Sequence, residues 1–412
     1  MDFSQSSDTN GRVGISYPSN YLVPGQLPAP QSVKSIMLHR KGSSNAPPII
    51  KLGSNQQLVL SFDELANLSG QFRITFTHHN QYWENSNLPD DWFIDGINEL
   101  IIGGGEKNAL HEPDYFHYDI EFPNNQINFK ISGNYMLHVS DFSSGTELFS
   151  LPFFVTEEAG TMTSRVETIY NAGPGGAPID QPFSVLTNPD FVEFPQFDLT
   201  FFFVQNRFWG QTRETDIFDI SRKGETGFHL SRHRSYAANF DFNGLRLNNF
   251  TQGGQIIEWL PGLTPPKAVL REDILNFSSD PVPSWNSTFG LPESDRNSRY
   301  ANVRFRFADG GQFNTSQGVY LVGDFNQWLL SDKHKLEYNP NSGYWETTAL
   351  IKEGSYTYKY AIKSGRDGVD DLTLSDSITR RTQEYVSLVY FHDPAYRYYR
   401  LIQADVFYST DQ

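Results

Sequence analysis

Histidine pairs are the first residues of this chain whose type and spacing could hold a metal ion. His78 and His79 are adjacent, and adjacent side chains of a strand point to opposite faces, so both rings cannot reach one ion. His111 and His117 stand six residues apart rather than the four of a helical zinc motif, and Pro113 interrupts any helix between them. The histidine spacing therefore favours structural roles over a metal site.

Two further stretches resemble ligand loops only in composition. Residues 367–371 hold Asp367, Asp370 and Asp371, but they lack the alternating ligands and the terminal glutamate of a calcium loop. Residues 103–105 are three glycines, without the spacing or the Ser/Thr of a phosphate loop. We predict ordinary turns at both places, and no cofactor and no metal for the chain.

Catalytic nucleophiles are equally hard to find. The chain has no cysteine, which excludes disulfides, thiolate metal sites and thiol catalysis. No serine stands in the Gly-x-Ser-x-Gly pattern of a nucleophile elbow. We predict that the protein is not an enzyme. A hydrolase that uses two carboxylates stays open as an alternative, because 48 acidic residues could supply such a pair.

The composition of the 412 residues narrows the class of protein further. Asp and Glu outnumber Lys and Arg by 48 to 32, a net charge of −16, which disfavours a nucleic-acid partner. Aromatic residues reach 15% and charged residues only 19%, which favours an exported β-protein. No apolar run approaches the roughly 20 residues of a membrane-spanning helix. Residues 1–5 do not resemble a signal peptide, so we expect the numbering to begin on a mature or engineered form if the protein is exported.

Hydrophobic residues alternate with a period of two along most of the chain, and helical spacing is scarce. The alternation predicts strands at residues 58–62 and 72–78, among others. This pattern predicts an all-β protein of three consecutive immunoglobulin-like β-sandwich domains. Polar breaks near residues 157–161 and 277–299 set the expected boundaries. The predicted division is a polar, proline-containing leader at 1–32, an N-terminal sandwich at 33–158, a middle sandwich at 159–294 and a C-terminal sandwich at 295–412.

The sharpest local motif lies in residues 318–328, Gly-Val-Tyr-Leu-Val-Gly-Asp-Phe-Asn-Gln-Trp. It resembles the start of the early-set β-sandwich that binds glycogen, and residues 353–360 are similar to a later part of that family. The resemblance implies that Trp328 could stack on a glucose ring, although the second tryptophan usual in that family is missing from residues 361–366. A glucan-binding accessory module is thus an alternative function, beside a core or rim position for Trp328.

Ordered stretches of the N-terminal part carry a second resemblance. They are residues 35–38, 47–53, 58–65, 93–99, 122–124 and 132–137, together with His79, Trp83, Ser86, Leu88 and Tyr118. With the C-terminal sandwich and the ending Arg400-Leu401-Ile402, the chain resembles the plug protein of the type IX secretion system of Bacteroidota. The middle part is less similar: residues 224–229 read Gly-Glu-Thr-Gly-Phe-His, where the family would have a Gly-Asn-Glu-Phe turn.

The resemblance to the plug family implies a function and a location. It implies a non-catalytic periplasmic protein, associated with the outer membrane through a large β-barrel translocon and not inserted in the membrane itself. It also implies that the protein seals the periplasmic end of that pore when no cargo adapter is bound, as a monomer within a heteromeric complex. An occluding surface needs anchors, and exposed aromatic side chains are good ones. We expect Trp83, Trp92 and Phe93 to be such contacts, with a place inside their own domain core as the competing prediction.

Overall fold

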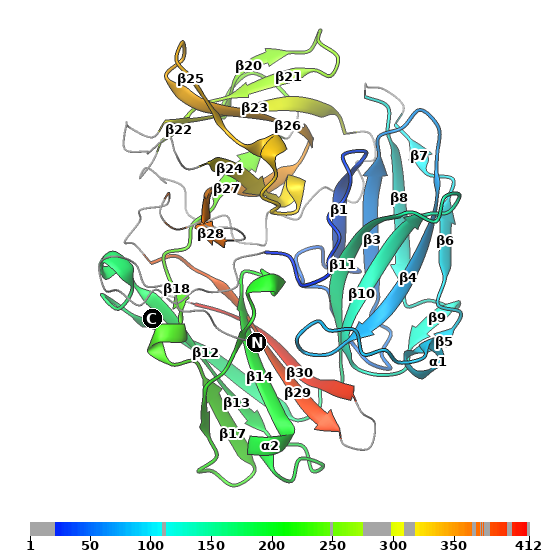
Figure 1. Ribbon diagram of the computed structural model, residues 1–412, viewed down its shortest axis with the longest axis vertical. Coiled ribbons are helices and arrows are strands. Elements are labelled where there is room, and N and C mark those ends of the chain that lie inside the picture. Colours follow the sequence, from blue (N-terminus) through cyan, green and yellow to red (C-terminus); the bar gives the residue numbers. More distant parts are fainter. Residues whose placement is uncertain are drawn as a thin grey trace.

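The computed structural model describes residues 21–108, 113–247, 250–274, 298–308, 318–364, 368–370, 372, 374, 380–393 and 398–409. Almost all regular structure in these residues is β-strand, which confirms the predicted fold class. The sheets pair into three sandwiches, which we call the first, middle and C-terminal sandwiches (Figure 1). The helices are single turns: α1 (Asp90–Phe93), α2 (Pro195–Asp198), η1 (Pro174–Gly176), η2 (Trp209–Gln211), η3 (Arg232–Arg234), η5 (Asp324–Asn326) and η6 (Asp332–His334).

The first sandwich is built from one continuous stretch of chain. One sheet has the order β1-β3-β8-β7 and the other β2-β11-β10-β4-β6, and β5 and β9 form a separate two-stranded ribbon. Strand β4 shows why the sheets pack: phenylalanine and isoleucine alternate with polar residues, and each apolar side chain enters the shared core. The strand bounds are β1 (Val33–Arg40), β2 (Ile49–Lys51), β3 (Leu58–Glu64), β4 (Gln71–His79), β5 (Ile94–Gly96), β6 (Leu100–Gly103), β7 (Glu106–Lys107), β8 (Phe116–Phe122), β9 (Ile127–Phe129), β10 (Gly133–Asp141) and β11 (Glu147–Thr156).

The middle sandwich combines two distant parts of the chain. One sheet has the order β12-β13-β17-β16, with β18 beside β13, and the other has the order β15-β14-β29-β30. Its core contains side chains from both sheets, among them Phe201, Phe228 and Tyr385. The strand bounds are β12 (Thr161–Ile169), β13 (Ile179–Thr187), β14 (Leu199–Gln205), β15 (Arg213–Glu214), β16 (Ile217–Asp219), β17 (Glu225–His229), β18 (Tyr236–Ala237), β29 (Glu384–Asp393) and β30 (Tyr398–Tyr408).

The C-terminal sandwich is inserted between those two parts. One sheet has the order β19-β27-β24, with β28 beside β27, and the other has the order β20-β21-β23-β26-β25, with β22 beside β23. The two sheets share a core that includes Leu245, Phe305 and Tyr358. The strand bounds are β19 (Asn243–Arg246), β20 (Ile256–Leu260), β21 (Lys267–Leu270), β22 (Asp273–Ile274), β23 (Tyr300–Ala308), β24 (Val319–Gly323), β25 (Glu337–Asn339), β26 (Tyr344–Lys352), β27 (Ser355–Ser364) and β28 (Gly368–Asp370).

Strand pairing crosses the boundary predicted between residues 294 and 295. Strand β19 pairs with β27, and β21 pairs with β23, so β19 and β21 already belong to the C-terminal sandwich. In the other direction, β29 returns to pair with β14 of the middle sandwich. The sequence pattern could not reveal this exchange, because alternation shows that one face of a strand is buried but not which sheet the strand joins.

The predicted leader also differs from the structure within residues 21–32. Tyr21 and Val23 are buried, and the backbone of Leu27 exchanges hydrogen bonds with Ser150 of β11. The backbone N–H of Ala29 donates to the side chain of Gln327 in the C-terminal sandwich. The second half of the leader is therefore part of the packed fold, where it bridges the first and C-terminal sandwiches.

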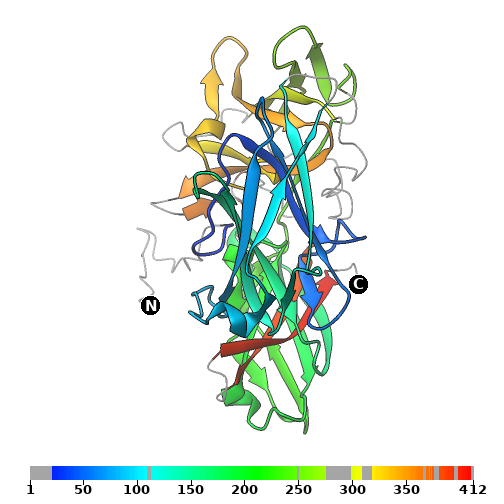
Figure 2. The same cartoon turned by 90° about the vertical axis from the view of Figure 1, so that its right-hand side faces the viewer.

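The three sandwiches form an elongated body. In Figure 1 the C-terminal sandwich lies at the upper end, the middle sandwich lies at the lower end, and the first sandwich lies beside both. The view turned by 90° shows the first sandwich in front of the junction between the other two (Figure 2). No helix within the described residues is long and apolar enough to span a bilayer.

Candidate functional site

The adjacent histidines of β4 are both held by hydrogen bonds inside the first sandwich. The His78 ring contacts the Ser86 hydroxyl at 2.8 Å and the Ser132 carbonyl at 3.1 Å, while the His79 ring contacts the Trp83 carbonyl at 2.9 Å. Burial lowers the pKa of His78 to about 4, so this ring is neutral at physiological pH. The two rings thus have separate structural partners. In the described part of the chain, no group of three or more His, Asp or Glu side chains is arranged to hold a metal ion.

The other stretches that resemble ligand loops can be compared with the structure only where it describes them. His111, Glu112, Asp367 and Asp371 lie outside the described residues. The three glycines occupy the end of β6 and the turn that follows it, where Gly104 has a φ of +69°. This is the ordinary turn predicted from the sequence.

The three predicted partner contacts lie in different environments. Trp83 is 7% exposed and packs on Phe154 and His79, and Phe93 is 2% exposed in the core of the first sandwich. Neither ring can contact a partner in this conformation, and for Phe93 the competing core prediction describes the structure better. Trp92 of α1 is 51% exposed, because the single turn of helix points it away from the core that receives Phe93.

Trp328 has no free face for a sugar. It is 8% exposed and packs against the rings of Tyr21, Phe208 and Phe242, with centroid distances of 5.1 to 5.7 Å. Its indole N–H donates to Asp324 at 3.1 Å. The ring therefore ties together the leader, the middle sandwich and the C-terminal sandwich, which leaves the glucan-binding alternative without support.

An apolar junction joins the first sandwich to the middle sandwich. We define it by Trp83, Met136 and Phe154 on one side and Phe202, Trp209, Tyr390 and Leu401 on the other, all of which belong to one buried cluster. Phe154 lies at its centre, 5.5 Å from Trp83 and 4.7 Å from Trp209 between ring centroids. The Tyr390 hydroxyl donates to the side-chain oxygen of Asn134 at 2.6 Å. This junction is thus mainly hydrophobic.

A charged junction joins the first sandwich to the C-terminal sandwich. We define it by Asp63, His117 and Ser35 on one side and Tyr300 and Lys352 on the other. The fully buried carboxylate of Asp63 lies 2.6 Å from the His117 ring, 2.7 Å from the Tyr300 hydroxyl and 2.8 Å from the Lys352 ammonium. A buried carboxylate with several donors is stabilised in its charged form.

The pKa values at the charged junction follow from these contacts. Burial alone would raise the pKa of Asp63, but the hydrogen bond with His117 and the charge of Lys352 hold that pKa below its usual value. Burial alone would lower the pKa of His117, but its hydrogen bonds with Asp119 and Asp63 raise it to about 9. At neutral pH the junction therefore contains a carboxylate between two cations.

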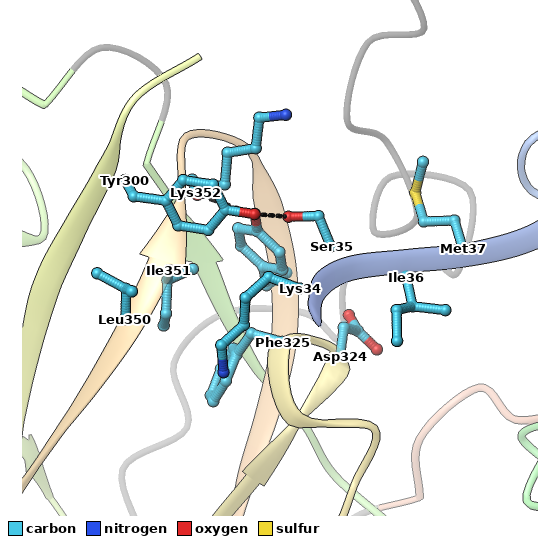
Figure 3. A pocket seen from close by; sticks show the side chains of 11 residues that line it. Lys34, Ser35, Ile36, Met37, Tyr300, Asp324, Phe325, Leu350, Ile351 and Lys352 are labelled. Atoms are coloured by element: carbon cyan, nitrogen blue, oxygen red, sulfur yellow. Dashed lines mark hydrogen bonds between the residues drawn. The ribbon is translucent and has the colours of Figure 1, made fainter. Parts of the chain in front are cut away.

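A small cavity lies beside this junction, between β1 and the C-terminal sandwich (Figure 3). Figure 3 shows the hydrogen bond between Tyr300 and Ser35 at one side and the carboxylate of Asp324 at the other. Burial raises the pKa of Asp324 to about 6, although contacts with Thr357 and Trp328 oppose that rise. The cavity measures about 40 Å³, which holds a few water molecules at most. Its size excludes a cofactor or a sugar.

Sequence reasoning missed the most exposed aromatic loop of the middle sandwich. Residues 188–198 join β13 to β14 and carry Phe191, Phe194 and Phe197, which are 38%, 57% and 78% exposed. Phenylalanine recurs there at every third position, a signal that could have singled out the loop. We call residues 188–198 the phenylalanine loop.

The fold and these contacts define the general class of the protein. The chain is a multidomain β-sandwich protein whose junctions are closed by aromatic and charged side chains, and whose cavity beside the charged junction is too small for a substrate. Residues 33–157 match the family described as the type 9 secretion system plug protein 1st domain. The first sandwich is thus similar to this family of domains, which confirms the resemblance found in the N-terminal sequence. The match supports a role of the chain in type IX secretion.

Solved structures add information on the fold. A crystal structure of a hypothetical protein from Parabacteroides merdae aligns with 94% of this chain and 100% of its own chain, with a TM-score of 0.81 and 21% sequence identity. This likeness shows that the arrangement of sandwiches recurs in another protein. The C-terminal domain of the antigen I/II-family protein AspA from Streptococcus pyogenes reaches a TM-score of only 0.16 at 9% identity, over 90% of this chain and 98% of its own. No sequence among the curated proteins matches the chain.

Proposed function

We propose that this chain is a non-catalytic periplasmic plug, which closes the periplasmic end of the type IX outer-membrane translocon when no cargo adapter is bound. The observation that carries the proposal is the match of residues 33–157 to the first domain of plug proteins. The partner is then a large outer-membrane β-barrel, which the plug contacts as a monomer without entering the bilayer.

The packing of the sandwiches supports a role in occlusion. A plug has to resist deformation when it fills the end of a wide pore. Here the apolar junction, the charged junction and the cluster around Trp328 connect the sandwiches in pairs. Buried and densely packed contacts of this kind have low compressibility. The body can thus block a pore as one unit.

One of the predicted anchors stays compatible with this role. Trp92 is exposed on α1, whereas Trp83 serves the apolar junction and Phe93 serves the core. The exposed ring of Trp92 is therefore a candidate contact with the translocon barrel.

The proposal is tested in the native host. A tagged chain is expected to co-purify with a very large outer-membrane barrel, in near-stoichiometric amount, after mild detergent extraction. Deletion of the gene is expected to raise the entry of a bulky antibiotic that the outer membrane normally excludes, and re-expression of the chain should restore the barrier. A chain recovered alone, together with an unchanged barrier in the deletion strain, would contradict the proposal.

A further inference from the structure

The phenylalanine loop exposes aromatic side chains that the fold itself does not use. Phe194 and Phe197 are 57% and 78% exposed, whereas the flanking Val192 and Leu199 are buried in the middle sandwich. Burying a phenylalanine ring stabilises a fold, so two rings left largely in water forgo that stabilisation. Grouped apolar side chains on a surface are typical of interaction sites.

The backbone of the loop is held in place by hydrogen bonds. The carboxylate of Asp198 accepts from the backbone N–H of Phe194 at 2.8 Å, and the backbone N–H of Phe197 donates to the carbonyl of Phe194 at 2.9 Å. Pro195 opens the turn of α2 between them. The rings are thus presented on a fixed turn, and a partner would bind them without first ordering the loop.

Packing contacts fix the first part of the loop as well. The ring of Phe191 lies 5.1 Å from that of Phe391 on β29, and the guanidinium of Arg400 lies 4.5 Å above it. The same guanidinium is paired with Glu157 and Asp393. Arg400 therefore holds the phenylalanine loop against the middle sandwich. Its positive charge is balanced by Glu157 and Asp393.

The exposed apolar surface continues onto the neighbouring edge strand. Phe218 of β16 is 44% exposed and lies 5.5 Å from Phe201 near the start of β14. Phe197 precedes Phe201 by four residues, a reach of at most about 14 Å along the chain. Ile217 and Ile220, beside Phe218, are also exposed, and β16 is the last strand of its sheet. Phe201 thus connects the edge strand, whose Phe218 it contacts, to the loop, which ends three residues before it.

The charges of the loop indicate what it can bind. Residues 188–198 contain Asp190, Glu193 and Asp198 and no basic residue. On the neighbouring turn, Arg222 pairs with Glu225, and Lys223 follows it. Aromatic rings among carboxylates complement an apolar pocket with a basic rim. The same carboxylates disfavour an anionic lipid surface.

We propose that the phenylalanine loop, with Phe218 beside it, is the surface by which this chain docks into an apolar, basic-rimmed pocket of a partner protein. The inference rests on the proposed function, in which that partner is the translocon. The loop is well placed for insertion, because α2 lies near the lower end of the long axis, away from the C-terminal sandwich (Figure 1).

The test compares two exposed aromatic sites in the tagged full-length chain. One variant carries Phe194→Ser and Phe197→Ser, and the matched control carries Tyr338→Ser on β25 of the C-terminal sandwich, where the ring is 51% exposed. All these side chains are exposed, so the urea midpoint of each variant should stay at the wild-type value. The phenylalanine variant is expected to retain at least tenfold less translocon barrel than wild type, and the tyrosine variant the wild-type amount.

Two further measurements test the role of the loop's charges and the choice of a protein partner over a lipid surface. A chain with Asp190→Asn and Glu193→Gln is expected to retain about threefold less barrel, with a weaker dependence on salt concentration. Equal retention of the barrel by the phenylalanine variant and wild type overturns the inference while the proposed function stands, as does an equal loss in the tyrosine variant. Binding of the wild-type loop to phosphatidylethanolamine–phosphatidylglycerol vesicles overturns the choice of a protein partner. If wild type retains no barrel, the proposed function fails, and the inference fails with it.

Discussion

The first sandwich contacts its two neighbours through junctions of opposite chemistry. The apolar junction with the middle sandwich is a cluster of aromatic and aliphatic side chains around Phe154, with one buried hydrogen bond from Tyr390. The charged junction with the C-terminal sandwich is centred on the carboxylate of Asp63. Burial of apolar area is non-directional, whereas a carboxylate that accepts hydrogen bonds needs its donors at fixed positions. We infer that the first junction supplies adhesion and the second supplies orientation.

Of the substitutions at the two junctions, Phe154→Ala should cause the largest loss of stability. Phe154→Ala opens a cavity between Trp83 and Trp209, which is expected to cost about 4 kcal/mol of stability. Urea unfolding of the full chain measures the loss, and hydrogen exchange at Glu157 and Ala159 should rise, because their amides donate to β30 across the same junction. The loss should be equal at pH 6 and pH 9, and a difference greater than about 1 kcal/mol would contradict an apolar origin. Phe197→Ala, on the surface, is the matched control and should change stability by less than about 0.5 kcal/mol.

Removing one charge from the charged junction should destabilise the protein slightly less than Phe154→Ala does. Lys352→Met leaves the carboxylate of Asp63 buried with only His117 to balance it, so a loss of about 3 kcal/mol is expected. Adding Asp63→Asn removes the unpaired charge as well. The double variant should be more stable than the sum of the two single losses predicts, by about 1–3 kcal/mol. Strictly additive losses from urea unfolding would show that the two side chains do not interact.

Of the two junctions, only the charged junction should make stability depend on pH. His117 has a folded pKa of about 9 against an unfolded value near 6.5, so its contribution is complete below pH 6.5 and is lost as the pH rises through 9. Asp63 has a lowered pKa, so its contribution is present above pH 4 and is lost in stronger acid. Between pH 6.5 and 9.5 the chain should lose at most about 3 kcal/mol. His117→Gln should remove this slope, and a slope that persists in the variant would assign it to other groups.

The two junctions also show how far the sequence alone leads. Alternation predicted strands at 58–62 and 72–78, which the structure contains as β3 and β4, because a half-buried strand has a recognisable period. Trp83 is different. A tryptophan in a polar loop has the composition of an exposed anchor, and only the position of the middle sandwich shows that the ring is covered. Asp63, Tyr300 and Lys352 are ordinary residues in the sequence, separated by up to 289 positions. Contacts at that separation leave no local pattern, and neither does the return of β29 to β14.

Two tyrosines offer the smallest and most direct comparison of the junctions. Tyr390→Phe removes the hydroxyl that donates to Asn134, a neutral hydrogen bond, and should cost about 1 kcal/mol. Tyr300→Phe removes the hydroxyl that donates to the carboxylate of Asp63, a charged acceptor, and that also shares a hydrogen bond with Ser35, and should cost about 2 kcal/mol. Both rings are 1% exposed, so the two variants lose the same atom at the same burial. Urea unfolding at pH 6 measures both costs, and in acid strong enough to protonate Asp63, whose pKa is lowered, the cost at Tyr300 should fall towards that at Tyr390. Equal costs at pH 6 would mean that the charge of Asp63 adds nothing to its hydrogen bond, and the orienting role of the charged junction would lose its basis.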